Sequence, residues 1–173
     1  MSSYAGLAKE TMRARLLSRR RSRGETEREL VAKALAFHAA ALGALANASS
    51  VAAYLSMPSE PNTEELIDSL LARGIEVLVP KSWPDRSMTW VKYQSAAVSV
   101  GDLGVPEPDS SAESGSLADC EFAFIPALAV DHHGNRLAHV AHLIHGQGPQ
   151  FHRRLHANDE GLGPALHVRG GQD

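Results

Sequence analysis

Several features are scarce in this 173-residue sequence, and each absence excludes a class of protein. Only one cysteine is present, Cys120, so the chain cannot form an internal disulfide. No run of about 18 apolar residues occurs, which argues against a membrane-spanning helix. The first residues also lack an apolar core followed by a small-residue cleavage site. We therefore expect a cytoplasmic protein without membrane association, with Cys120 buried in its core.

Neither sign of charge predominates, because the net charge is only −3. The absence of a positive excess argues against general nucleic-acid binding. That balance conceals an arginine cluster near the start, which comprises Arg13, Arg15, Arg19, Arg20, Arg21 and Arg23. The cluster has three interpretations: a basic arm for nucleic acid or anionic membrane, a solvated helix face, or a phosphate contact. Lys9 and Arg13 are four residues apart, so on a helix they share a face and could meet one phosphate group.

The length fits one domain, and the chain alternates between helical and strand-like segments. Helices are expected over residues 5–20, 26–45 and 62–73, and strands over residues 51–56, 75–81, 88–93 and 122–126. A proline- and serine-rich loop is expected over residues 101–115. This β-α-β alternation predicts an α/β fold, a three-layer α/β/α arrangement with a mostly parallel open sheet.

Helix boundaries carry their own signals. Thr26 with Glu29 forms a capping-box pattern that predicts the start of the second helix. Asn62 and Glu65 predict the start of the third helix, and Gly74 predicts its end. The second helix is expected to bury one stripe, which consists of Leu30, Val31, Ala34, Leu35, His38, Ala41, Leu42 and Leu45.

Polar or turn residues follow several of the predicted strands, at the sheet edge where α/β proteins bind ligands. These segments, together with the first helix, occur in a fixed order: Lys9 with Arg13, Tyr54-Leu55-Ser56 with Glu60, Thr63-Glu64, Arg73-Gly74, Pro80, Met88, residues 104–108 (Gly-Val-Pro-Glu-Pro), residues 126–131 (Pro-Ala-Leu-Ala-Val-Asp) and residues 134–137 (Gly-Asn-Arg-Leu). In that order they resemble the 5-formyltetrahydrofolate cyclo-ligase family, also called 5,10-methenyltetrahydrofolate synthetases.

The resemblance implies a single cyclo-ligase-like domain over residues 1–173, of which residues 138–173 are atypical. It also implies an ATP-dependent ring closure that converts 5-formyltetrahydrofolate to 5,10-methenyltetrahydrofolate and releases ADP and phosphate. ATP contacts are implied for Lys9, Arg13 and Arg136. A catalytic role is also implied for Arg136, and Mg²⁺ contact is implied for Asp131. Folate contacts are implied for Tyr54, Met57, Glu60 and Trp83. The expected partner is a small-molecule folate, and the expected state is a monomer.

The family continues after its arginine-leucine pair with a glycine-rich phosphate loop, and this sequence departs from it. The residues after Leu137 contain no glycine until Gly146. If an insertion precedes the loop, Gly146 and Gly148 match its ATP-binding glycines and Arg154 matches a catalytic cation. Glycines suit such a loop because backbone N–H groups can turn toward phosphates without a Cβ in the way.

Two alternatives therefore stay open beside the active enzyme. One is a catalytically impaired paralogue that binds folate or nucleotide. The other is a metal-binding or interaction module, since eight of the nine histidines lie between His132 and His167. Within that stretch, spacings of three or four residues that could bind zinc or nickel occur at His139, His142, His145, His152 and His156.

Overall fold

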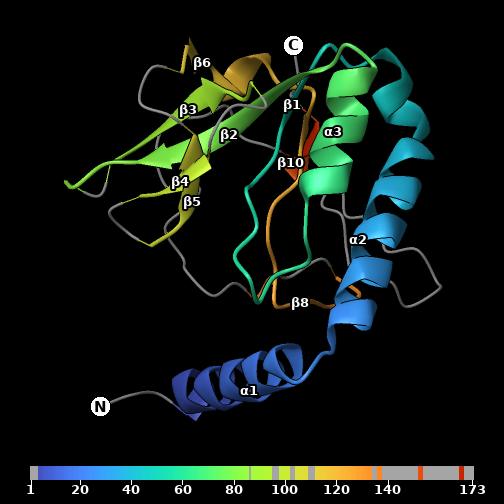
Figure 1. Ribbon diagram of the computed structural model, residues 1–173. Coiled ribbons are helices and arrows are strands. Elements are labelled where there is room, and N and C mark those ends of the chain that lie inside the picture. The colour runs from blue at the N-terminus through green and yellow to red at the C-terminus, as the bar shows by residue number, and fades with distance from the viewer. Residues whose placement is uncertain are drawn as a thin grey trace.

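The computed structural model describes residues 4–85, 87–94, 98–101, 104–108, 112–133, 136–137, 152–153 and 168–169 (Figure 1). Its helices are α1 (Tyr4–Arg21), α2 (Glu25–Ala40) and α3 (Glu64–Ala72), with short 3-10 turns η1 (Gly43–Asn47) and η2 (Leu117–Asp119). The strands up to β6 are β1 (Ser50–Ala52), β2 (Glu76–Ser82), β3 (Met88–Lys92), β4 (Val98–Val100), β5 (Pro106–Pro108) and β6 (Ser114–Gly115). The later strands are β7 (Phe122–Ala123), β8 (Ala129–Val130), β9 (Arg136–Leu137), β10 (His152–Arg153) and β11 (Val168–Arg169).

A five-stranded sheet in the order β6-β3-β2-β1-β7 organises the molecule. Strand β1 pairs in parallel with β2 and with β7, whereas β3 is antiparallel to both β2 and β6. Three further two-stranded ladders pair β4 with β5, β8 with β9, and β10 with β11. The α/β fold class is confirmed, with the parallel pairing concentrated at β2, β1 and β7.

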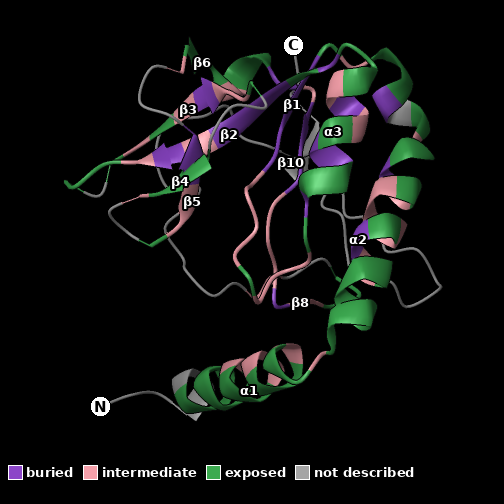
Figure 2. Cartoon of the chain, in the orientation of Figure 1, coloured by how far each residue is buried: buried purple, intermediate pink, exposed green. Residues whose placement is uncertain are grey.

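The main core lies between the sheet and the helices α2 and α3 (Figure 2). Helix α3 buries Leu66, Ile67 and Leu70, each no more than 1% exposed, against the central strands. Removing one such side chain from water contributes about 2 kcal/mol, so this face holds α3 on the sheet. A smaller buried cluster includes Cys120, which is 3% exposed, as expected for a core cysteine.

Two predicted helix details are wrong. Helix α2 begins at Glu25 with Gly24 as its N-cap, so Thr26 lies inside the first turn and does not act as the capping residue. The helix ends at Ala40, before the predicted end at residue 45. Most of the predicted stripe is confirmed, because Leu35 and Leu42 pack against the core and Leu45 is fully buried, but Leu30 is 63% exposed. Gly24, in an extended conformation, takes the N-cap position that the capping-box pattern gives to Thr26.

The start and end of α3 follow their sequence signals more closely. Asn62 Oδ1 accepts a hydrogen bond of 2.8 Å from the Glu64 backbone N–H, and this satisfies a donor of the first turn. Gly74 follows the helix with a φ of 75°, a left-handed conformation that favours glycine. The helix therefore ends where predicted.

Two loop boundaries also differ from expectation. Strand β1 ends at Ala52, so residues 53–56 form the start of a loop, although a strand was predicted to continue to Ser56. The predicted loop over residues 101–115 contains β5 and β6. Glu107 of β5 is 5% exposed, and its Oε1 accepts a hydrogen bond of 3.0 Å from the Ser82 backbone N–H. That bond joins the β4-β5 hairpin to the end of β2.

Glu121 joins the amino ends of β7 and β1. Its Oε1 accepts hydrogen bonds from Ser49 N (3.2 Å) and Ser49 Oγ (2.7 Å), and its Oε2 accepts one from Ser50 N (2.9 Å). Partial burial opposes the charged form, but the bonds from Ser49 and Ser50 outweigh it and hold the pKa of Glu121 below its ordinary value. The charged carboxylate therefore stabilises the folded state.

We expect Glu121→Gln to lower the free energy of unfolding by about 1 to 2 kcal/mol at pH 7, because its amide nitrogen cannot accept a backbone N–H bond. A group with a depressed folded pKa stabilises the fold above its unfolded pKa and loses that contribution as the pH falls. Urea unfolding at several pH values should show the difference shrinking below about pH 4. Glu29→Gln, at an exposed position of α2, is the control, and an equal loss in both variants would contradict the prediction.

Candidate functional site

The parallel strands β1 and β7 end at the same edge of the sheet, and α1 lies beyond that edge (Figure 1). The segments that follow the two strands run side by side toward α1 (Figure 1), beginning where Phe124 N donates a 2.8 Å hydrogen bond to Ala52 O. Ligands of open α/β sheets bind at this carboxyl edge. The candidate site is therefore formed by α1 and by residues 53–63, 124–133 and 136–137.

The loop after β1 is held in shape by its own hydrogen bonds. The buried Thr63 donates from Oγ1 to the carbonyl oxygen of Tyr54, at 2.6 Å. Glu60 N donates to Met57 O at 2.8 Å, and Glu60 Oε2 accepts from Met57 N at 3.0 Å. Glu60 is therefore presented on a closed turn, with one carboxylate oxygen bonded to the turn itself.

Arg20 of α1 lies against both loops. Its Nη2 donates a hydrogen bond to the carbonyl oxygen of Ala127, in the segment after β7. Partial burial lowers the pKa of Arg20, whereas the nearby Glu60 and Tyr54 raise it. Burial, with a further contribution from Glu60, raises the pKa of Tyr54 above its usual range, so its hydroxyl stays protonated at neutral pH.

The segment after β7 returns on itself as a short ladder. Leu128 N donates to Leu137 O at 2.7 Å, and β8 pairs antiparallel with β9. Arg136, on β9, is partly buried and donates from Nη1 to Pro126 O at 3.0 Å; burial lowers its pKa. Asp131 lies in the turn, where its Oδ1 accepts from His133 N at 2.9 Å.

Helix α1 carries Lys9, Arg13 and Arg20 on one face, and Arg20 contacts these loops. Lys9 is exposed, whereas Arg13 and Arg20 are partly buried at positions four and eleven residues further on. A hollow of about 650 Å³ lies between α1 and β8 and is lined by Leu7, Ala8, Thr11, Met12, Arg15, Leu16, Arg19 and Ala129. None of the predicted site residues lines it, although Ala129 belongs to the segment after β7 that forms part of the candidate site.

Comparison with known proteins decides the family. The sequence model of the 5-formyltetrahydrofolate cyclo-ligase family matches residues 5–140, which is most of the chain. This chain belongs to that family.

Relatives of this cyclo-ligase family member agree with the assignment. A Mycolicibacterium smegmatis protein named 5-formyltetrahydrofolate cyclo-ligase is 32% identical over 156 residues, covering 86% of this chain and 75% of the relative. The NMR structure of Aquifex aeolicus 5,10-methenyltetrahydrofolate synthetase matches with a TM-score of 0.66 at 24% identity, over 81% of this chain and 68% of that one. The Mycoplasma pneumoniae synthetase matches with a TM-score of 0.55 at 15% identity, over 76% and 71% of the respective chains. The two solved structures show that the fold is shared.

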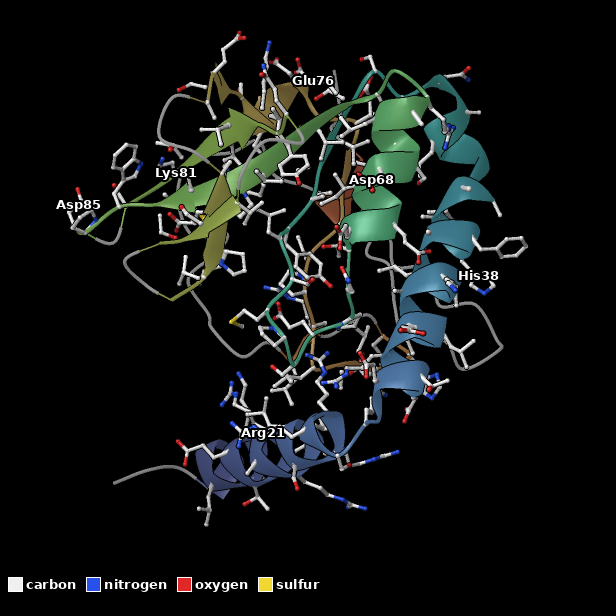
Figure 3. All side chains as sticks on the ribbon, viewed as in Figure 1. Arg21, His38, Asp68, Glu76, Lys81 and Asp85 are labelled. Carbon is white, nitrogen blue, oxygen red and sulfur yellow. The ribbon has the colours of Figure 1, made fainter. Side chains whose placement is uncertain are left out.

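The cyclo-ligase chain brings together only some of the predicted site residues. Tyr54, Met57 and Glu60 share one loop, and Arg20 connects that loop to α1. Trp83 instead lies at the β2-β3 turn, where its Nε1 donates to Thr89 Oγ1 at 3.0 Å and the Lys81 ammonium lies 5.3 Å from its ring centre. This turn, marked by Asp85, lies far from Arg21 of α1 (Figure 3).

Other predicted residues of the cyclo-ligase site lie outside the described residues: Gly146, Gly148 and Arg154. The same holds for His139, His142, His145 and His156 of the predicted metal-binding stretch. Within the described ranges, no three histidine, cysteine or acidic side chains group closely enough to hold a metal ion. No helix among these ranges is both long and apolar enough to cross a membrane.

Sequence reasoning missed two residues that shape this site. Arg20 was grouped with its arginine neighbours, although its position seven residues after Arg13 places both on one helix face. Thr63 was noted only as the residue that opens α3, although it is 1% exposed and fixes the Tyr54 carbonyl. A buried hydroxyl needs a hydrogen-bond partner, but the sequence does not reveal which one.

Proposed function

We propose that this cyclo-ligase family member catalyses the ATP-dependent conversion of 5-formyltetrahydrofolate to 5,10-methenyltetrahydrofolate. The observation that carries the proposal is the meeting of α1 with both carboxyl-edge loops at Arg20. The helix carries cationic side chains suited to phosphate, and the loop carries a carboxylate and a phenol suited to a pterin. Both halves of an ATP-plus-folate site therefore share one edge of the sheet.

The reaction needs ATP because the formyl oxygen is a poor leaving group. In the proposed first step that oxygen attacks the γ-phosphorus of ATP, the bond to the bridging oxygen breaks, and ADP leaves. Folate N10 then attacks the activated formyl carbon, which closes the five-membered ring, and N10 loses its proton. The carbon–oxygen bond to phosphate then breaks, and phosphate departs to leave the methenyl group. Catalysis of such a transfer depends mainly on positioning and on stabilising negative charge.

On the phosphate side we assign ATP contacts to Lys9, Arg13 and Arg136. Lysine supplies a point charge and arginine a bidentate fork, which together suit a polyphosphate. Arg136 already donates from Nη1 to Pro126 O, so its role combines loop support with charge. We also assign backbone contacts to phosphate for Gly146 and Gly148, and we assign Arg154 as a catalytic cation.

Mg²⁺ fits this arrangement as an ion carried with the nucleotide. Such an ion needs only one or two protein carboxylates, because phosphates and water supply its other ligands. Asp131 is the carboxylate we assign to it, in the turn between β8 and β9. When bound, Mg²⁺ would offset the negative charge of the phosphates.

On the folate side we assign the pterin N–H donors to Glu60. The closed turn that ends at Glu60 holds its carboxylate beside the protonated hydroxyl of Tyr54. Met57 supplies apolar surface in the same loop. Trp83 keeps a proposed stacking role toward the more distant part of the folate, since it lies on the β2-β3 turn.

The test follows the absorbance of the methenyl product with purified chain, 5-formyltetrahydrofolate, Mg²⁺ and ATP. We expect a rise that depends on ATP and is matched by release of equal amounts of ADP. A nonhydrolysable ATP analogue should give no rise. If a folded chain is stabilised against heat by 5-formyltetrahydrofolate yet forms no product, the proposed turnover is wrong.

That last outcome would favour a second candidate, a paralogue that binds folate or nucleotide without turnover. It is favoured by one observation: valine, leucine and isoleucine, but no glycine, occur in the residues between Leu137 and Gly146. β-branched residues are poorly suited to the positive φ angles that phosphate loops use. Calorimetry with ATP in the absence of folate would then distinguish a paralogue that binds nucleotide from one that binds only folate.

A further inference from the structure

Two arginines from distant parts of the chain hold consecutive carbonyl groups of one segment. Arg136 of β9 donates to Pro126 O at 3.0 Å, and Arg20 of α1 donates to Ala127 O. Both guanidinium groups are partly buried, and burial lowers the pKa of each. The segment after β7 is thus fixed from its own return strand and from the first helix.

Arg20 differs from its arginine neighbours in what it contacts. Arg19 and Arg21 are exposed, whereas Arg20 is partly buried. Beyond the Ala127 carbonyl, Arg20 lies close enough to Glu60 and Tyr54 to interact electrostatically with both. One side chain therefore connects three separate elements of the site: α1, the loop after β1 and the segment after β7.

Helix α1 depends on such a connection for its placement. It joins α2 through residues 22–24, and large apolar side chains on it remain exposed, with Leu7 at 59% and Met12 at 57%. Its partly buried positions after the first turns are Arg13, Leu16, Leu17 and Arg20. Because α1 buries so little apolar surface, a charged hydrogen bond contributes a large part of the interaction that holds the helix in place.

We propose that Arg20 is a positioning residue, which fixes α1 across the carboxyl edge so that Lys9 and Arg13 face the folate loop. The inference rests on the proposed function, because it assigns phosphate to α1 and folate to Glu60. Arg20 itself bonds protein groups and does not contact the reacting atoms. Its contribution is the alignment of two bound substrates.

The test compares Arg20→Gln, Arg20→Lys and the control Arg21→Gln, which makes the same charge change at an exposed neighbour. Since small misplacement of reacting groups is costly, Arg20→Gln should lower kcat by about 10-fold, with KM for each substrate within about 3-fold. Arg20→Lys should restore part of kcat, because lysine can donate to Ala127 O as a point charge. Arg21→Gln should match the wild type.

Hydrogen exchange distinguishes a local loosening of α1 from a general loss of stability. Amides of residues 7–19 should exchange faster in Arg20→Gln, while those of α3 should not change. Unchanged exchange in α1 would overturn the proposal, as would a higher KM for a single substrate with kcat intact. Hydrogen exchange can be measured without turnover, so the two proposals can fail independently. A wild-type chain without activity would contradict the proposed function, whereas unchanged exchange in α1 of Arg20→Gln would contradict the role of Arg20.

Discussion

Glu60→Ala is expected to raise KM for 5-formyltetrahydrofolate by about 100-fold, since each hydrogen bond to a charged group contributes about 1.5 to 3 kcal/mol. The pterin presents amino and ring N–H donors that would lose their acceptor in the variant. KM for ATP should stay within about 3-fold, because Glu60 lies on the folate loop and not on α1. Steady-state kinetics with each substrate varied in turn measures both values.

Loss of Glu60 also removes the bond from Met57 N, so a second variant separates charge from loop shape. Glu60→Gln keeps an oxygen that can accept from Met57 N. It should still show most of the KM increase if the carboxylate pairs with the pterin. Glu64→Ala, at an exposed position in the first turn of α3, is the control and should leave KM unchanged. Full folate affinity in Glu60→Gln would reduce Glu60 to a structural role.

Arg13→Ala is expected to have the opposite selectivity and raise KM for ATP by about 50-fold, by loss of charged hydrogen bonds to phosphate. The helix face that carries Arg13 also carries Arg20, which places this side of α1 against the folate loop. KM for 5-formyltetrahydrofolate should change by less than about 3-fold. Isothermal calorimetry with ATP alone checks the binding component.

Two further variants sharpen that prediction. Arg15→Ala removes the same charge from an exposed position two residues away and should leave KM for ATP near the wild-type value. Arg13→Lys should recover only part of the affinity, because a lysine lacks the planar fork of arginine. Equal losses in Arg13→Ala and Arg15→Ala would mean that the helix attracts ATP only through its general charge.

The sequence predicted the family and the local elements better than it predicted how those elements meet. Helix α3 could be bounded because Asn62 and Gly74 are strong end signals that act through local backbone bonds. The Tyr54-to-Glu60 loop could be placed at the sheet edge because it directly follows a buried strand. Such features depend on neighbours in the chain, which sequence reasoning can assess.

Features set by long-range docking were harder to predict. Arg20 looks identical to Arg19 and Arg21 in sequence, and only the phase of the docked helix distinguishes it. The place of Trp83 was also hard to predict, because this residue lies on the turn between β2 and an antiparallel β3. The antiparallel direction of β3 could have been predicted from the sequence. Parallel strands need a connection of about a dozen residues, and the connection between β2 and β3 is far shorter.

The link between Arg20 and Ala127 has a consequence for how the protein is made. The two residues are 107 positions apart, so the first helix leaves the ribosome well before its partner exists. At a synthesis rate of about 5 to 20 residues per second, that interval lasts several seconds or more. A contact of such long range can form only after a long stretch of chain has been brought together, which has an entropic cost. The nascent chain therefore carries its first helix undocked until the strand beside β1 has emerged, and a product terminated before residue 127 cannot assemble this junction.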